Sequence, residues 1–328
     1  MGEPRELTYD QQLDLLEQRG MIVSANNRQS PSKMETIGYY KIKEFANPYF
    51  TDNSYNGVEL GKIVTRFYHD KNMRMHVLHA IEKIEISLKI KVAYYMGNKY
   101  GAYGYLTFNN WYNRNKCTPE KMRERQTKFR NKLEKSVRRS SNPDVTNRNN
   151  LNEHGQPTVW LGINLLMFGD LEFLIKNMNR SALTWIAKQY RLDSYQELLS
   201  MVGLIHFVRN ICCHNSNLVD TQYKTVPSIR EEWKPLLFET KNVAGDTIYS
   251  NHLSIAIVVI KYLVDQINPQ YQWSEIGKDL VKLGKPVRND NKTTYEYLGF
   301  KSINSIRELF ANDIKALKAI NRAYSHIE

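Results

Sequence analysis

The sequence predicts an all-α protein, and three observations carry that prediction. Apolar residues recur at three- and four-residue steps in several long segments, as one face of a helix requires. Strand-like runs, such as TIYSN at 247–251, are too few to build a sheet. An apolar content of 41% with 21 Tyr is typical of a globular chain. We therefore expect a helical bundle with a substantial core.

The length of the chain predicts two parts. A chain of 328 residues is long for a single core. We expect a principal domain over residues 1–226 and a C-terminal helical extension over 227–328. The first helix is predicted to begin at Thr8, with Gln11 as its capping-box partner, and to end at Gly20.

The remaining elements follow from the helical period. A long helix is expected from about Asp70 to Met96, because apolar residues recur there from Leu78 to Val92. Further helical patterns occur at 121–139, 159–178, 182–190, 201–214, 252–268 and 302–325. The segment 140–158, rich in Asn, Ser and Pro, is predicted to be a long mobile loop.

Positive charge is concentrated in one segment. The chain carries a formal net charge of +12, which favours a polyanionic partner. Nine basic and two acidic residues at 121–139 supply +7 of that charge, while Phe129, Leu133 and Val137 form a thin apolar seam. A solvated helix face also explains such a run. The candidate RNA-binding residues are Lys121, Arg123, Arg125, Lys128, Arg130, Lys132, Lys135, Arg138 and Arg139.

The cysteines and the first residues of the sequence indicate the cellular compartment in which the protein is expected. Only Cys117, Cys212 and Cys213 occur, and the last two are neighbours, so no disulfide framework is expected. No apolar run approaches the roughly 20 residues that span a bilayer, and the start lacks an apolar leader segment. We expect a cytoplasmic protein with no membrane contact.

No metal or cofactor is expected. His69, His76 and His206 have no carboxylate or cysteine partners at metal-ligand spacing, and adjacent cysteines make a poor zinc pair.

The helix at 201–214 carries polar residues that packing alone does not require. At about 100° per residue, its apolar side chains cluster on one face, and the opposite face holds His206 and Asn210. Arg209 and His214 bound that polar face, about 140° apart. Asn210 precedes His214 by four residues and is expected to reach its ring and fix its tautomer.

The chemistry that suits this arrangement is metal-independent RNA cleavage, in which a 2′-hydroxyl attacks the adjacent phosphodiester. A histidine can transfer the protons and an arginine can stabilise the developing charge. The alternative is structural, with His214 bonded to carbonyl groups at the helix end and Arg209 in an ordinary ion pair. Spacing alone favours this alternative, because Arg74 and His79 show the same spacing in the long central helix.

A resemblance favours the catalytic interpretation. RNICCH at 209–214 resembles the Arg-Asn-x-x-x-His motif of the HEPN-superfamily ribonucleases. Its surroundings resemble the Abi-like abortive-infection proteins of the AbiD and AbiF group. The similar stretches are TYDQQLDLLEQRGMIV, IGYYKI, HAIEKIEISLKIKV and PTVWLGINLLMFGDLEFLIKNM, which together span about residues 7–220.

The resemblance implies an all-helical HEPN-like bundle that cleaves RNA in phage defence, usually as a homodimer whose two motifs form one cleft. It assigns catalytic roles to Arg209, Asn210 and His214. After the motif this chain reads HNSNL, where family members often have a second His or an Arg. A small structured RNA that restrains the toxin is implied by resemblance only. Two alternatives remain, a non-catalytic RNA-binding component of a defence or toxin–antitoxin system and a helical scaffold.

Overall fold

The computed structural model describes residues 6–29, 32–285 and 294–325. As predicted, this part of the chain is all-α apart from one small hairpin. The α-helices are α1 (Tyr9–Gln18), α2 (Ala25–Gln29), α3 (Ser32–Ile37), α4 (Tyr39–Ala46), α5 (Leu60–Tyr100), α6 (Phe108–Trp111), α7 (Pro119–Arg139), α8 (Pro143–Thr146), α9 (Val159–Gly162), α10 (Phe168–Asn177), α11 (Arg180–Lys188), α12 (Tyr195–Cys213), α13 (Leu253–Ile267), α14 (Ser274–Leu283), α15 (Ile303–Leu309) and α16 (Ile314–Tyr324). Short 3-10 helices lie at Asn47–Tyr49, Gly104–Leu106, Arg114–Lys116, Arg148–Asn150, Ile163–Leu165 and Glu231–Trp233. The hairpin pairs β1 (Glu239–Lys241) with β2 (Thr247–Tyr249) in antiparallel register.

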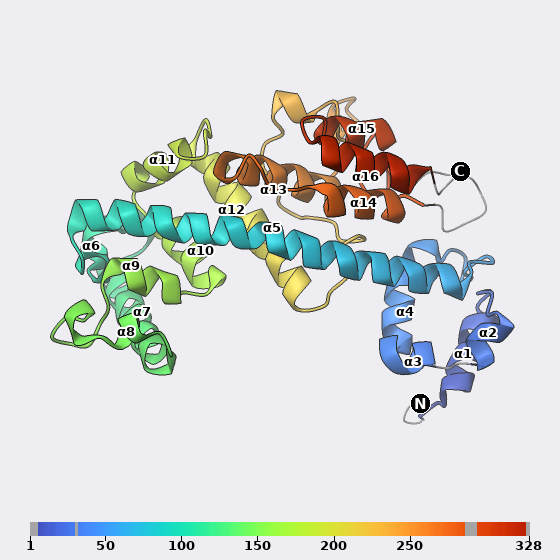
Figure 1. The fold of residues 1–328 in the computed structure, drawn as a ribbon, viewed down its shortest axis with the longest axis horizontal. Helices are drawn as coiled ribbons and strands as arrows, with labels where there is room; N and C mark the ends of the chain where they lie inside the picture. Colours follow the sequence, from blue (N-terminus) through green and yellow to red (C-terminus); the bar gives the residue numbers. More distant parts are fainter. Residues whose placement is uncertain (1–5, 30–31, 286–293, 326–328) are drawn as a thin grey trace.

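Helix α5 is the axis of the molecule. Its 41 residues extend about 60 Å, at about 1.5 Å per residue, and Figure 1 shows it running along the length of the fold. The predicted helix at about 70–96 was too short at both ends. Its first turns carry Arg66 and Asp70, which are buried in ion pairs, so charge there does not indicate an exposed face.

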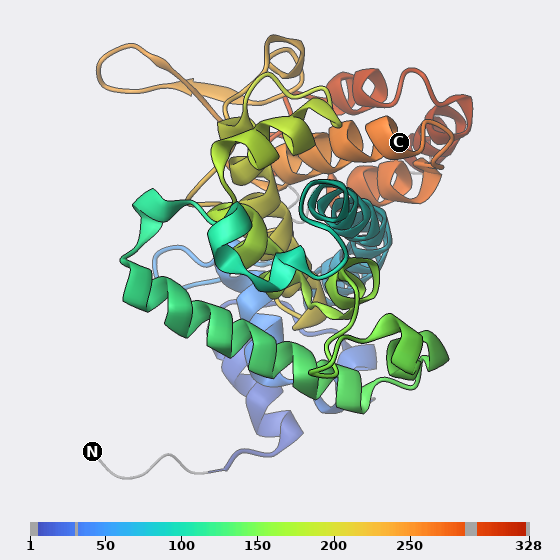
Figure 2. The ribbon, with the colours of Figure 1, turned by 90° about the vertical axis from the view of Figure 1, so that its left-hand side faces the viewer.

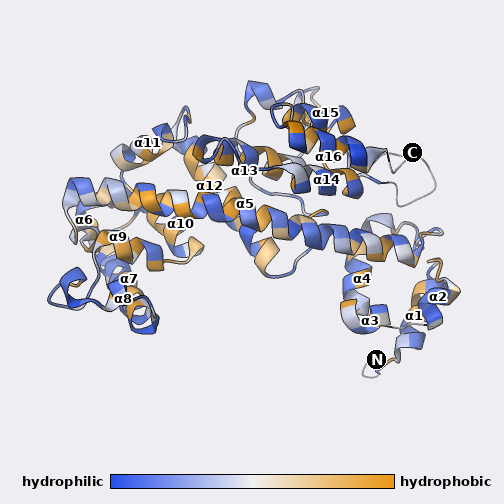
Figure 3. Cartoon of the chain, viewed as in Figure 1, coloured by the Kyte–Doolittle hydropathy of each residue, from blue (hydrophilic) through white to orange (hydrophobic). Residues whose placement is uncertain are grey.

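The other helices are arranged around α5. Helices α12, α13 and α14 pack against it, and α13 to α16 lie together along one side in Figure 1. The other side carries α1 to α4 near one end of α5 and α6 to α9 near the other, and Figure 2 shows α7 standing away from the axis. Figure 3 shows α7 and α8 as predominantly hydrophilic ribbons.

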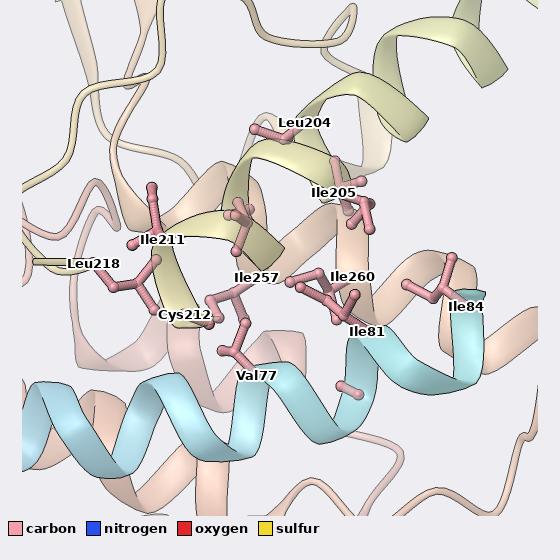
Figure 4. Packing of buried hydrophobic residues seen from close by; sticks show 14 of the residues in the cluster. Val77, Ile81, Ile84, Leu204, Ile205, Ile211, Cys212, Leu218, Ile257 and Ile260 are labelled. Atoms are coloured by element: carbon pink, nitrogen blue, oxygen red, sulfur yellow. The ribbon is translucent and has the colours of Figure 1, made fainter. Parts of the chain in front are cut away.

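The core is continuous from α5 into the C-terminal helices. Figure 4 shows side chains of α5, α12 and α13 meeting, among them Ile81, Ile205 and Ile257. These residues are fully buried. The division of the chain at residues 226 and 227 stays a prediction, although residues from both parts share this hydrophobic cluster.

Two predicted elements in the C-terminal part differ from the structure. Helix α14 was missed, and the single helix expected at 302–325 is divided into α15 and α16. Asp313 causes that division, because its side chain accepts hydrogen bonds from the backbone N–H groups of Ala316 and Trp273. It therefore acts as the N-cap of α16 and anchors it to the start of α14.

The segment at 140–158 is folded, contrary to the predicted long mobile loop. It contains α8 and a 3-10 turn, and its asparagines organise it. Asn142, Asn147 and Asn152 each accept hydrogen bonds from backbone N–H groups two residues later, and Asn152 also from Gln156. Such side-chain to backbone bonds stabilise turns in a sequence that resembles a loop by composition.

No helix in the described ranges is both long enough and apolar enough to cross a membrane.

Candidate functional site

Helix α12 divides into the two faces that the sequence predicts. Six side chains, those of Met201, Leu204, Ile205, Val208, Ile211 and Cys212, are buried against the core. His206 and Asn210 are half-buried on the opposite side, and Cys213 is exposed. Burial raises the pKa of Cys212 to about 12, so its thiol is not a nucleophile at neutral pH.

Arg209 and His214 lie at the two edges of the polar face. Arg209 is half-buried, and His214 is exposed at the C-cap of α12. Neither side chain forms a hydrogen bond or an ion pair with any residue in the described part of the chain. The structural alternative requires such partners, so the arrangement leaves both groups available to a ligand.

The predicted contact between Asn210 and His214 is wrong. The Asn210 side chain lies 3.1 Å from Nε2 of His206, which is one turn earlier in the same helix. Only backbone atoms connect Asn210 with His214, through a hydrogen bond from the His214 N–H to the Asn210 carbonyl. Asn210 therefore cannot fix the tautomer of His214 in this arrangement.

His206 contacts a carboxylate, an amide and an aromatic ring. Its Nδ1 is 2.7 Å from the Glu172 carboxylate of α10, which also forms an ion pair with Lys176 at 2.6 Å. The imidazole stacks on Phe168 with the ring centroids 5.5 Å apart. No local spacing in the sequence indicates this carboxylate, because Glu172 lies 34 residues before His206.

The chain after the motif is attached to α5. Asp70 is fully buried and accepts hydrogen bonds from the N–H groups of Leu218 and Val219, both at 2.9 Å. Arg74 donates to Asp70 through Nε at 2.7 Å and to the Asn215 side chain through Nη1 at 2.8 Å. Asn215 follows His214 directly and adopts a left-handed conformation with φ +54°.

The attachment through Asp70 gives a structural role to Arg74, which forms the second Arg-x4-His match with His79. Arg74 is buried and belongs to the support of the motif, whereas His79 is exposed and bonds to the Tyr271 hydroxyl at 2.8 Å. The two residues have separate structural roles.

The Abi-like protein family matches residues 32–220, which is more than half of the chain and includes α12 with its motif. The chain belongs to the Abi-like family. This membership suggests a role in abortive infection, a form of phage defence. Neither the curated proteins nor the solved structures contain a significant match.

The basic helix of this Abi-like protein is α7, as predicted, and its nine cations divide into three groups. Arg125 and Arg130 are half-buried and bond to Tyr112 and to the Leu106 carbonyl. Lys128, Lys132 and Arg138 are exposed but form ion pairs. Lys121, Arg123, Lys135 and Arg139 are exposed and form no ion pair within the described ranges. The last group is best suited to bind an external anion.

Helix α10 connects the basic helix with α12. Lys132 of α7 forms an ion pair with Asp170 of α10 at 2.6 Å. Glu172, which is also on α10, bonds to His206 of α12. Asp170 and Glu172 are two residues apart, about 200° around α10, so the two contacts leave this helix on nearly opposite sides. Helix α10 therefore lies between the cationic helix and the polar face of α12.

Metal-ligating side chains do not gather in the described part of the chain, where no group of three or more could hold an ion. His76 does have a carboxylate partner, Asp279, at 2.7 Å, from a helix that lies 203 residues further on. Two groups are too few for a structural metal site.

We expect the Asp70 attachment to stabilise the fold strongly. Asp70→Ala leaves the buried Arg74 and two backbone N–H groups without their acceptor, which should lower the free energy of unfolding by about 3–5 kcal/mol. Glu124→Ala, which breaks an exposed pair with Lys128, is the control and should leave the free energy of unfolding nearly unchanged. Urea unfolding of both variants measures the difference, and equal losses would contradict the assignment.

Proposed function

We propose that this protein is a metal-independent endoribonuclease toxin of abortive infection and that Arg209 and His214 are its catalytic residues. One observation carries the proposal: both side chains border the polar face of α12 without any partner in the described structure, while the opposite face is buried. Groups that only stabilise a fold are normally paired. HEPN-superfamily membership, inferred from the motif, is part of the same proposal.

The two side chains suit different parts of the reaction. His214 accepts or donates a proton as the 2′-hydroxyl attacks the phosphodiester and the 5′-oxygen leaves. Arg209 stabilises the charge that develops on the phosphoryl oxygens. Asn210 is assigned a supporting role, because it bonds to His206 and so belongs to the Glu172–His206 network beside the site.

The substrate RNA is proposed to contact the exposed cations of α7 and to reach Arg209 and His214 on α12. Support comes from the unpaired cations Lys121, Arg123, Lys135 and Arg139, which can neutralise phosphates and release counterions. A non-catalytic RNA-binding role is the second candidate, and the same four cations favour it because they serve binding without chemistry. A small regulatory RNA would use this surface in either case.

Assembly as a homodimer is also proposed. Phe207 is 49% exposed on α12, and at about 100° per residue it lies close to His214 around the helix. An exposed aromatic side chain beside the motif is suited to a contact that brings two motifs together.

His214→Ala should separate catalysis from binding. Loss of the proton-transfer group should lower the RNA cleavage rate by a factor of about 10² to 10⁴, with affinity nearly unchanged. Arg209→Ala should lower both rate and affinity. His79→Ala, an exposed histidine of the second match, is the control and should retain cleavage. Cleavage by His214→Ala at the wild-type rate would leave RNA binding as the function.

Two matched pairs of substitutions test the RNA surface. Lys135→Gln with Arg139→Gln removes unpaired charges, and Lys128→Gln with Arg138→Gln removes charges already paired with glutamates. Each lost phosphate contact should reduce the slope of log affinity against log salt by about 0.7 for single-stranded RNA. We expect a reduction of about 1.4 for the first pair and a clearly smaller one for the second. An unchanged slope in the first pair would identify α7 as a solvated face.

Phe207→Asp should weaken the dimer. Sedimentation at micromolar concentration should show a dimer for the wild type and for Ile314→Asp, which changes an exposed apolar residue on α16. Phe207→Asp should sediment as a monomer, because the carboxylate cannot be buried without a partner. A fully active, monomeric wild type would refute the shared cleft.

A further inference from the structure

A polar cavity lies beside the first turns of α5. Its volume is about 510 Å³, within the range of about 300–1,000 Å³ that small-ligand sites occupy. Residues of α3, α5 and α14 line it, together with Lys285. The basic helix α7 packs beyond the other end of α5, where Phe129 contacts Tyr105 at 6.2 Å between ring centroids. Helix α7 and the lining helix α3 therefore lie near opposite ends of α5 (Figure 1).

Cations dominate the cavity lining. Lys62, Thr65, Arg66 and His69 lie on one face of α5, at positions i, i+3, i+4 and i+7. Lys33, Lys282 and Lys285 approach from outside α5. Among the lining residues that the structure describes, Glu59 is the one carboxylate, and it lies 3.6 Å from Lys62. Five formal positive charges thus surround one negative charge.

Three of the lysines form no ion pair within the described ranges, although Lys282 lies near the carboxylates of Glu275 and Asp279. Lys33 bonds only to the neutral Asn27 side chain at 2.7 Å, and neither Lys282 nor Lys285 forms an ion pair within the described ranges. The C-terminal dipole of α14 accounts for Lys282, which lies in its last turn. It does not account for Lys33 on another helix or for Arg66 on the opposite wall.

Arg66 forms the inner wall and is only 3% exposed. Its Nη2 donates to Asp220 at 2.5 Å, and its guanidinium lies over the rings of Tyr49 and Tyr297. Nε and Nη1 are buried and have no acceptor in the described structure. Unsatisfied donors of a buried cation are costly, and an oxyanion is the group that would satisfy them.

The histidine on the same wall indicates a positive local potential. Burial and, to a smaller extent, the charges of Lys282 and Lys285 together lower the pKa of His69 to about 4. His69 is therefore neutral at physiological pH, and it can donate one hydrogen bond to an anion without adding charge.

We propose that this cavity binds a small oligophosphate, either free or as the phosphate groups of a nucleotide. Cations on three sides of the cavity exceed what one phosphate can contact, which favours a ligand with two or more phosphate groups. Arg66 also connects the cavity with the chain after the motif, because Asp220 bonds to Asn217, close to the residues that Asp70 holds. The proposal does not depend on RNA cleavage.

Calorimetric titration of the full chain tests the proposal. The wild type should bind pyrophosphate and ADP. Lys282→Gln with Lys285→Gln should weaken binding at least tenfold, since two charge-assisted contacts are lost. Lys315→Gln with Lys318→Gln removes the same charge from exposed positions on α16 and should change the affinity less than twofold. If the double variant unfolds at a lower temperature than the wild type, Lys285→Gln alone is tested in its place.

The ligands distinguish the two sources of phosphate. Equal binding of pyrophosphate and ADP supports recognition of phosphate alone, and binding of ADP only supports a nucleotide ligand. Absence of binding at millimolar concentrations of both overturns the proposal, as does equal weakening in the α16 control. Binding of a short RNA that depends on Lys282 and Lys285, without binding of pyrophosphate, would also overturn it and assign the cavity to an RNA backbone.

Discussion

The buried carboxylate of Asp70 is the contact on which the candidate site depends. Burial raises its pKa to about 6, although Arg74 and two backbone N–H groups favour the charged form, so Asp70 is ionised at neutral pH. Through Arg74 it reaches Asn215, and through its own oxygens it holds Leu218 and Val219. The turn that ends α12 and presents His214 is thereby fixed to the central helix.

The same arrangement separates supporting charges from available ones. Arg66 and Arg74 are buried and paired with carboxylates, and these pairs hold the chain that follows the motif in position. Arg209 and His214 have no partner in the described structure. A buried ion pair is weak support for stability in itself, but its loss is costly because an unpaired charge remains. Contacts with α5 thus fix the chain next to the motif, while the side chains of Arg209 and His214 stay accessible.

Much of the fold and part of the site could be predicted from the sequence. Helical periodicity, which is a local property, predicts the distribution of side chains around α12. It places Arg209 and His214 at the borders of the polar face. The Glu172–His206 pair could not be predicted, because it joins two helices that meet only in the tertiary structure. Asn210 had two histidines four residues away, one on each side, and the sequence does not decide between them. The structure pairs it with His206.

Other differences arise where polar residues have structural roles. The start of α5 was missed because buried ion pairs resemble an exposed surface in sequence. The asparagines at 142–152 resemble a loop, yet their side chains stabilise successive turns. Asp313 did offer a signal, since an aspartate within a helical pattern can act as an N-cap.

We propose that Arg209 and His214 cleave RNA by attack of the 2′-hydroxyl, and the chemical nature of the RNA ends formed in the presence of EDTA distinguishes this reaction from others. We expect 2′,3′-cyclic phosphate and 5′-hydroxyl ends, because His214 transfers the protons and the 2′-oxygen displaces the 5′-oxygen. Fragments with 5′-phosphate and 3′-hydroxyl ends, or loss of cleavage in EDTA, would contradict it.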